Sequence, residues 1–286
     1  MRCATAGLAG AAGRGSVLKR IVTGLVSAAV LLALLYVRGP AMDIALAAVS
    51  LLGCVEMVKT FGRTGVSVAA VPIYGMAALM LPAYLFASYT GLYLLTIAAM
   101  LGIMLCVVFR KEPAWLDIAA SVCVPVFVLI PMALFYPLIR ITPDPLGGLM
   151  ALLAFLIAYL GDTFAYFIGV LFGKHKLAPE VSPKKTWEGA IAGLFGSIGG
   201  AALLFYAGGA LTGLELPPLW HFIPLGLVGG IAGQLGDLSA SMIKRFCGVK
   251  DFGTLFPGHG GMLDRLDSVL FVAYVVFGYC LLMGMV

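Results

Sequence analysis

Residues 91–109 read GLYLLTIAAMLGIMLCVVF and contain no charged side chain. A helix of this length covers about 28 Å, close to the ~30 Å of hydrocarbon in a bilayer. Eight further apolar segments of similar character occupy residues 21–37, 41–57, 66–87, 115–137, 147–172, 189–211, 220–240 and 267–286. Helices satisfy their own backbone hydrogen bonds in lipid. The sequence therefore predicts an all-α polytopic membrane protein with about nine transmembrane helices.

The composition of the whole chain supports this class. Of 286 residues, 62% are hydrophobic and 11% charged, and the mean hydropathy is +1.08, whereas soluble domains are about 25% charged. Basic residues precede the segment 21–37 as in a signal peptide, but this segment is longer than usual and more spans follow, which predicts an uncleaved first span. The six cysteines are scattered singly and indicate packing residues.

The basic residues are distributed unevenly between the two sides of the predicted bundle. With a cytoplasmic N-terminus, 16 of the 18 lysines and arginines fall inside, and only Arg38 and Arg140 fall outside. This fits the positive-inside rule. We therefore expect the charged loops, and any site that they form, to face the cytoplasm. The expected location of this integral protein is a bacterial inner membrane. The net charge of +5 suits anionic lipid headgroups or a nucleotide, and no pattern predicts nucleic-acid binding.

The two halves of the chain differ in character. Residues 1–145 have short loops and mostly bland spans, and are interpreted as a transmembrane scaffold of about five spans. Residues 146–286 form the predicted catalytic region of about four spans, with two functional cytoplasmic loops of roughly 16 and 25 residues. Glycine pairs at small-xxx-small spacing in the last spans indicate internal helix packing, with a homodimer seam as the alternative.

Asp162 lies in the sequence G-D-T-F-A-Y (161–166), within the sixth apolar segment. A carboxylate inside an apolar helix costs roughly 2.5–3.5 kcal/mol on insertion scales unless it is paired or solvated. Asp162 is therefore a candidate functional residue, and a structural hydrogen bond to a neighbouring helix is the alternative. Asp43 and Glu56 are weaker candidates because both lie near predicted span ends, where the insertion cost falls.

The sequence S-P-K-K-T-W-E-G (182–189) predicts the start of the seventh helix. Ser182 is a good N-cap and the following proline a good first helical residue. Lys184 and Lys185 would then oppose the helix dipole, a conflict that a bound anion such as phosphate would remove. The alternative is a basic loop that contacts lipid headgroups. Glu188 could hold a lysine in place or reach a metal.

The most specific stretch spans residues 234–267. Asp237 lies within an otherwise apolar span, and Lys244 and Arg245 follow about two turns later. Asp264 and Asp267 are three residues apart, so on a helix they share a face, as carboxylates around a divalent cation would. The alternative is that Asp264 caps the ninth helix and Asp267 lies in its first turn.

Between these charged positions, the sequence P-G-H-G-G (257–261) cannot form a regular helix. Its glycines allow close approach of the backbone to a ligand. His259 could contact phosphate, donate a proton or bind a metal, or it could simply cap a turn. Lys250 is expected to contact phosphate or to pair with Asp251.

Several of these elements together resemble a known signature. The sequences S-M-I-K-R (241–245), K-D-F-G (250–253) and F-P-G-H-G-G-M-L-D-R-L-D (256–267), with the two upstream motifs, are similar to those of the phosphatidate cytidylyltransferase (CDP-diacylglycerol synthase) family. The specific resemblance covers roughly residues 160–267. It implies the substrates CTP and phosphatidate, a polytopic helical fold that is often dimeric, and Mg²⁺ at Asp237 and Asp264.

The resemblance and the residue patterns together assign roles. The predicted catalytic residues are Asp237, Asp264, Asp267, Lys244, Arg245 and His259, and the predicted substrate-binding residues are Lys184, Lys185, Ser182, Lys250, Arg265, Asp162 and Glu188. Expected partners are the two substrates, membrane lipids and a possible second copy of the chain. Two alternatives remain: a cytidylyltransferase for another lipid phosphate, and an ion-coupled transporter, which the absence of an inverted repeat disfavours.

Overall fold

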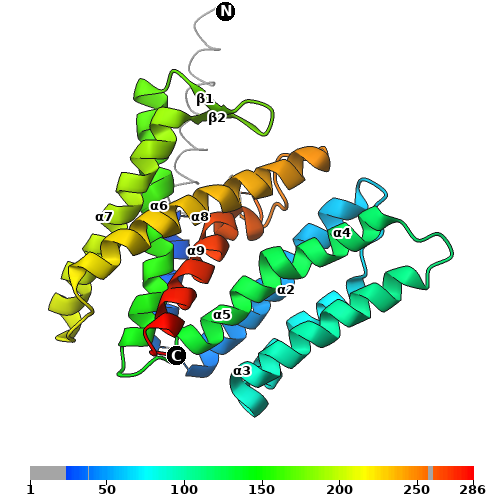
Figure 1. Ribbon diagram of the computed structural model, residues 1–286, viewed down its shortest axis with the longest axis horizontal. Coiled ribbons are helices and arrows are strands. Elements are labelled where there is room, and N and C mark those ends of the chain that lie inside the picture. The colour runs from blue at the N-terminus through cyan, green and yellow to red at the C-terminus, as the bar shows by residue number, and fades with distance from the viewer. Residues whose placement is uncertain (1–23, 38, 257–259) are drawn as a thin grey trace, which may run out of the picture.

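The computed structural model describes residues 24–37, 39–256 and 260–286, and it is almost entirely helical (Figure 1). Seven helical stretches in this part of the chain are long and apolar enough to cross a membrane, and the apolar helix Gly24–Val37 is shorter. The seven long stretches are α2 (Gly39–Gly62), α3 (Ala70–Val108), the stretch Trp115–Leu138, α6 (Leu146–Phe172), α7 (Trp187–Thr212), α8 (Leu219–Phe246) and α9 (Leu263–Leu282). The stretch Trp115–Leu138 comprises α4 (Trp115–Val124), the π-helical turn η1 (Pro125–Leu129) and α5 (Ile130–Leu138).

Helix α3 is a helical hairpin rather than one straight helix. Its 39 residues would extend about 58 Å, nearly twice the hydrocarbon thickness. The backbone leaves helical geometry at Ala87 and Ser88, and a Cβ on Gly102 would lie 3.1 Å from Pro72. The two arms therefore run antiparallel and match the separate predicted segments 66–87 and 91–109. The described residues thus contain nine apolar helical segments, as predicted.

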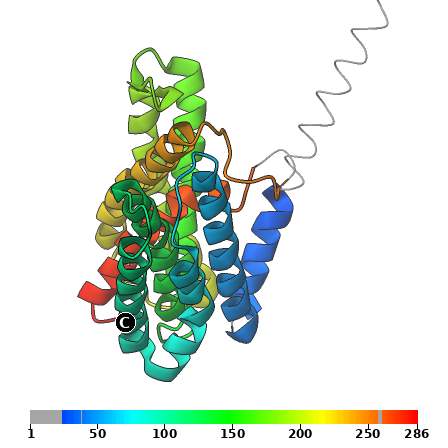
Figure 2. The ribbon, with the colours of Figure 1, turned by 90° about the vertical axis from the view of Figure 1, so that its right-hand side faces the viewer.

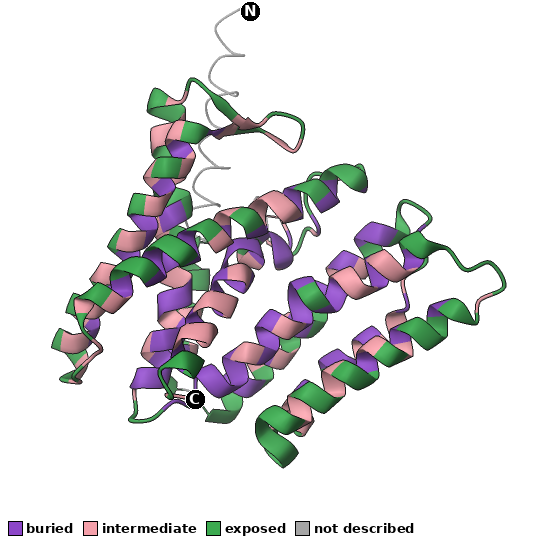
Figure 3. Cartoon of the chain, viewed as in Figure 1, coloured by how far each residue is buried: buried purple, intermediate pink, exposed green. Residues whose placement is uncertain are grey.

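Burial identifies the centre of the bundle. Of the most apolar window in the stretch Trp115–Leu138, 61% of the residues are buried, against 22% for α3, and Figure 3 shows the same contrast. Helix α3 therefore lies at the periphery, and the stretch Trp115–Leu138 separates it from α9 (Figure 1). Most of the exposed side chains of α3 are apolar, as expected for a surface that faces lipid.

The loops that carry most of the charged motif residues gather at one end of the bundle. The connections that follow α2, α6 and α8 lie toward the upper end in Figure 1, and those that follow α5 and α7 lie toward the lower end. At the lower end, the Arg140 guanidinium binds both Asp43 carboxylate oxygens at 2.7 Å. Arg140 is one of the two basic residues predicted on the side opposite the cytoplasm, and Asp43 neutralises its charge. Arg38 lies outside the described residues.

The predicted start of the seventh helix is wrong. Residues 182–186 form the strand β2 (Ser182–Thr186), which pairs antiparallel with β1 (Lys176–Ala178). Helix α7 begins only at Trp187, and Thr186 is its N-cap, with Oγ1 accepting the Gly189 N–H at 3.2 Å. Backbone pairing with β1 overrides the local signal of Ser182 and the proline. Lys184 and Lys185 therefore lie on a strand, and the helix-dipole argument for an anion does not apply to them.

Glycines fix the close packing of α6 against α7. A Cβ on Gly196 would lie 2.6 Å from the Leu160 carbonyl oxygen, and one on Gly200 would lie 2.6 Å from the Leu156 carbonyl oxygen. On α8, Gly229 and Gly233 similarly face side chains of α6 and α9. Small residues allow helices to approach closely in a membrane. Internal packing, the preferred interpretation of the glycine pairs, is therefore confirmed, and the homodimer stays a prediction.

This packing generates a first prediction. Gly196→Ala should lower the thermal unfolding midpoint of the detergent-solubilised protein, because overpacking a helix contact costs about 1–3 kcal/mol. Gly199→Ala, on the same helix, is the matched control, since a Cβ at Gly199 would have no neighbouring atom within 4 Å. Equal midpoints for the two variants would contradict the described contact between α6 and α7.

Candidate active site

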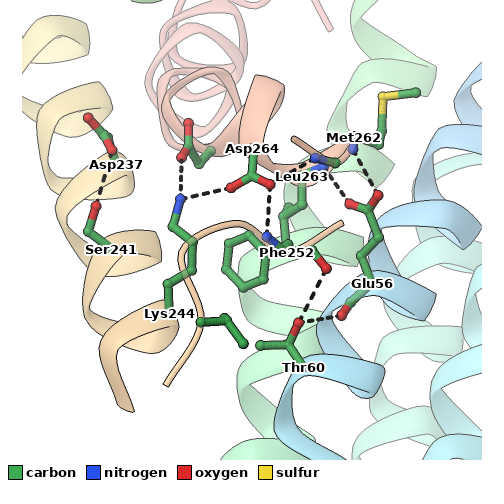
Figure 4. A network of polar contacts seen from close by, with 12 residues as sticks. Glu56, Thr60, Asp237, Ser241, Lys244, Phe252, Met262, Leu263 and Asp264 are labelled. Atoms are coloured by element: carbon green, nitrogen blue, oxygen red, sulfur yellow. Dashed lines mark hydrogen bonds and ion pairs between the residues drawn. The ribbon is translucent and has the colours of Figure 1, made fainter. Parts of the chain in front are cut away.

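A buried lysine joins the last two helices. Lys244, near the end of α8, places Nζ 2.8 Å from Asp264 Oδ1 and 3.9 Å from Asp267 Oδ2, both in the first turns of α9. Its side chain is 10% exposed, and Nζ also lies 5.1 Å from the centre of the Phe252 ring. Figure 4 shows these groups converging where α8 and α9 meet the loop that connects them. Charges of both signs therefore meet at this end of the helices.

The second oxygen of Asp264 shapes the return loop between α8 and α9. Oδ2 accepts the backbone N–H of Phe252 at 2.8 Å and that of Gly261 at 2.9 Å. Gly260 has φ +84°, and a Cβ there would lie 2.8 Å from the same oxygen. Glycine is therefore needed at this position for both conformation and space. One carboxylate holds a lysine and two parts of the loop together.

A residue from the first half of the chain completes this end of α9. Glu56 of α2 accepts the backbone N–H groups of Met262 and Leu263, both at 2.9 Å (Figure 4). It thereby caps α9, whose N-cap residue makes no side-chain cap of its own. A Cβ on Gly253 or Gly261 would lie 2.4–2.5 Å from the Glu56 carboxylate. The capping role proposed for Asp264 therefore belongs to Glu56.

A second ion pair ties the β-hairpin to α8. Lys185 Nζ lies 2.5 Å from Asp237 Oδ2, and each side chain is 27% exposed. The Ser241 hydroxyl lies 3.5 Å from the other Asp237 oxygen. The strand β2 thus brings a lysine over the carboxylate that the sequence analysis placed inside an apolar span. Because this pair is more open than Lys244 with Asp264, it is the more accessible to a soluble ligand.

Two further carboxylates lie near Asp237. The Ser268 hydroxyl donates to Asp162 Oδ2 at 3.0 Å, which links α6 to α9 and provides the interhelical hydrogen bond that was the alternative for Asp162. Asp267 accepts the Ser268 N–H at 2.9 Å. A Cβ on Gly236, the residue before Asp237, would lie 2.4 Å from the Asp267 carbonyl oxygen, so α8 and α9 are in contact here. Three helices therefore contribute carboxylates to one polar cluster.

The donor set suits a divalent cation. The cluster consists of four aspartates, Asp162, Asp237, Asp264 and Asp267, and two lysines, Lys185 and Lys244. The aspartates outnumber the lysines, and carboxylate oxygens are the ligands that Mg²⁺ prefers. As the side chains stand, no three histidine, cysteine, aspartate or glutamate residues of the described chain converge on one metal position. Asp237 and Asp264 pair with different lysines, and a shared metal site for them stays a prediction.

Most of the remaining predicted residues that the structure describes are exposed to solvent. Lys184, Lys250 and Arg265 are exposed. Arg245 is also exposed, and its Nε lies 3.4 Å from the Val181 carbonyl oxygen of the β-hairpin. Ser182 is half-buried in β2 and pairs with Ala178. No ion pair joins Lys250 to Asp251 within the described residues.

Glu188 binds neither lysine side chain of its loop: it accepts the backbone N–H of Lys174 at 3.1 Å and lies 2.6 Å from His175 Nδ1. It therefore closes the base of the β-hairpin. His259 lies outside the described residues.

Glu56 and Ser268 were not assigned to the site from sequence; a carboxylate in an apolar span was the available signal for Glu56.

The fold and the cluster define a class: a polytopic α-helical membrane protein with buried aspartates and lysines at one end of its helices. Within that class, the chain belongs to the Cytidylyltransferase family, whose match covers residues 18–283. The resemblance noted in the sequence is thereby confirmed.

Several proteins named phosphatidate cytidylyltransferase are similar to parts of this chain. A 122-residue region is 48% identical to a phosphatidate cytidylyltransferase of Staphylococcus aureus (strain COL), covering 42% of this chain and 45% of that protein. Proteins of the same name match from Thermotoga maritima, with 34% identity over 64% of this chain and 68% of the relative, and from Haemophilus influenzae, with 45% identity over 48% of each. The chain thus spans about half the length of the Staphylococcus and Haemophilus relatives that it matches.

The buried ion pair generates a second prediction. Lys244→Met should lower the free energy of unfolding by about 3–5 kcal/mol, because it leaves the Asp264 charge buried without its partner. Lys250→Met, at an exposed position, should have little effect. Thermal unfolding in detergent measures both, and adding Asp264→Asn to Lys244→Met should recover part of the loss. Indistinguishable midpoints for the two single variants would contradict the structural role of Lys244.

Proposed function

We propose that this protein transfers the cytidylyl group of CTP to phosphatidate, giving CDP-diacylglycerol and pyrophosphate, at the cytoplasmic membrane face with a divalent metal. The observation that carries the proposal is the cluster of four aspartates with Lys185 and Lys244, set at a membrane edge within the family region. The name phosphatidate cytidylyltransferase is shared by its relatives.

The proposed reaction needs no protein nucleophile. A phosphate oxygen of phosphatidate attacks the α-phosphorus of CTP, a new P–O bond forms, and the bond to the bridging oxygen of the departing pyrophosphate breaks. Both reactants are anions, so the main tasks are to position them and to offset their repulsion. Lysine ammonium groups at a site of low dielectric suit these tasks, since electrostatic interactions there are strong.

The different exposures of the two paired lysines favour different roles. Lys185 is 27% exposed and lies on a hairpin strand, so its ammonium group can exchange Asp237 for a substrate phosphate. Lys244 is 10% exposed and engages two aspartates, so it orients carboxylates. Exposed basic residues at Lys184, Arg245, Lys250 and Arg265 would attract and hold the phosphates of either substrate.

The aspartates are the proposed metal ligands. Asp237 and Asp264 would hold Mg²⁺, with Asp267 and Asp162 beside them. A bound Mg²⁺ would neutralise charge on the phosphates of CTP and on the departing pyrophosphate. Both carboxylates already have partners, but the Asp237 side chain is 27% exposed and the Asp264 side chain only 3%. Asp237 is therefore the better placed of the two to meet an incoming cation.

A third prediction tests this assignment. Asp237→Asn and Asp264→Asn should each reduce CDP-lipid formation from labelled CTP and phosphatidate by at least ~10²-fold, because the charge is lost while size is kept. Glu112→Gln, in the exposed loop after α3, is the control. A chelator should abolish wild-type activity until Mg²⁺ is restored. Near-normal activity of both Asn variants would refute the assignment, and a panel of other lipid phosphates tests the choice of lipid.

A fourth prediction concerns sidedness. Single cysteines at Ala178 in β1 and Thr254 in the return loop should resist an impermeant thiol reagent applied to intact cells, since both loops lie at the predicted cytoplasmic end. Both should react after the membrane is permeabilised. The parent chain, treated in the same way, corrects for the native cysteines. Labelling of either position from outside would overturn the proposed orientation.

A further inference from the structure

An apolar cavity of about 490 Å³ lies beside the polar cluster. Helix 24–37 forms one wall, and α2, α5, α6 and α9 form the others. Figure 2 shows helix 24–37 at the margin of the bundle, next to α2. Arg265 is the one charged residue among the described residues that line the cavity. The volume falls within the ~300–1,000 Å³ of typical small-molecule sites.

The cavity is elongated along the helices. Its lining extends from Phe256 and Met262, in the return loop, to Leu34, near the end of helix 24–37, and Met42, near the start of α2. Along helix 24–37 alone, the lining residues from Gly24 to Leu34 cover about 15 Å at 1.5 Å per residue. This apolar cavity, the slot, is therefore long enough to hold an extended hydrocarbon segment of about 15 Å.

One end of the slot adjoins the proposed catalytic residues. Arg265 follows Asp264 in the first turn of α9. The Tyr159 hydroxyl donates to the Arg265 carbonyl oxygen at 3.3 Å, and Tyr159 also lines the cavity. An amphiphile with its chain in the slot would therefore place an anionic head beside Arg265, at the edge of the aspartate cluster.

We propose that this slot binds one acyl chain of the lipid substrate, with Arg265 contacting the phosphate at its mouth. The inference rests on the proposed function and extends it to the site of the lipid tail. Surrounding lipid is as apolar as the slot, so an acyl chain gains little from burial alone. The charge complementarity of Arg265 is what favours a lipid phosphate over neutral lipids. The slot then fixes the direction from which the phosphate reaches Asp264.

A chain-length experiment tests the slot. Ala45 of α2 lines the cavity, whereas Ala48, one turn away, is exposed and is not among the lining residues. Ala45→Phe should raise KM for dioleoyl phosphatidate roughly tenfold and leave KM for dihexanoyl phosphatidate and for CTP nearly unchanged. Ala48→Phe, the matched control, should leave all three values as in the wild type.

The outcomes separate this inference from the proposed function. If the wild-type protein makes CDP-diacylglycerol and Ala45→Phe behaves like Ala48→Phe at both chain lengths, the slot assignment is refuted while the function stands. If Ala45→Phe raises KM equally for both lipids, the slot assignment is also refuted, because the change then acts on the headgroup site. If no lipid phosphate is a substrate, the proposed function fails, and the binding measurement that follows decides the slot.

That measurement uses the unaltered protein and needs no catalysis. Phosphatidate with a diazirine in one acyl chain is photolysed with the wild-type protein in phosphatidylcholine vesicles. Labels should map by mass spectrometry to lining positions such as Val49 and Val269, and excess dioleoyl phosphatidate should suppress them. Equal labelling of these positions by diazirine phosphatidylcholine would identify ordinary membrane lipid in the slot and overturn the proposal, as would labels confined to the outer surface.

Discussion

The carboxylate of Asp264 is the group on which the arrangement of the site depends. It binds Lys244 through one oxygen and two backbone N–H groups of the return loop through the other. In a setting with little water, each of these donors would cost several kcal/mol if it were left unpaired. The ends of α8 and α9 and the loop between them therefore adopt one arrangement together. Glu56 fixes that arrangement to α2 by holding the next two N–H groups.

The fold was largely predictable because the hydropathy of a span is a local property. Each helical segment corresponds to one apolar run, and the two arms of the α3 hairpin match the two predicted spans. The error at residues 182–186 has a nonlocal cause. Ser182 and the following proline carry the signals of a helix start, but pairing with Lys176–Ala178 makes them a strand. No local pattern contains that partner.

The same distinction separates the predicted and unpredicted parts of the site. Asp237, Lys244 and Asp264 could be selected from sequence because charges in apolar surroundings need partners. Their pairing could not, since Lys185 reaches Asp237 only after the hairpin folds over α8. Glu56 was ranked low because a carboxylate near a span end needs no special partner. Its contact with Met262 crosses 206 residues of chain, and the small size of Gly253 and Gly261 is understood only from that contact.

The long separation between Glu56 and the groups it caps also has a consequence for biogenesis. Chains grow at about 5–20 residues per second, so α2 is made roughly 10–40 s before the start of α9 exists. During that interval the carboxylate enters the membrane without its final donors. Its place near the end of α2 allows water or headgroups to solvate it at low cost. The Glu56 carboxylate is therefore already in place when Met262 and Leu263, the residues that it caps, are synthesised.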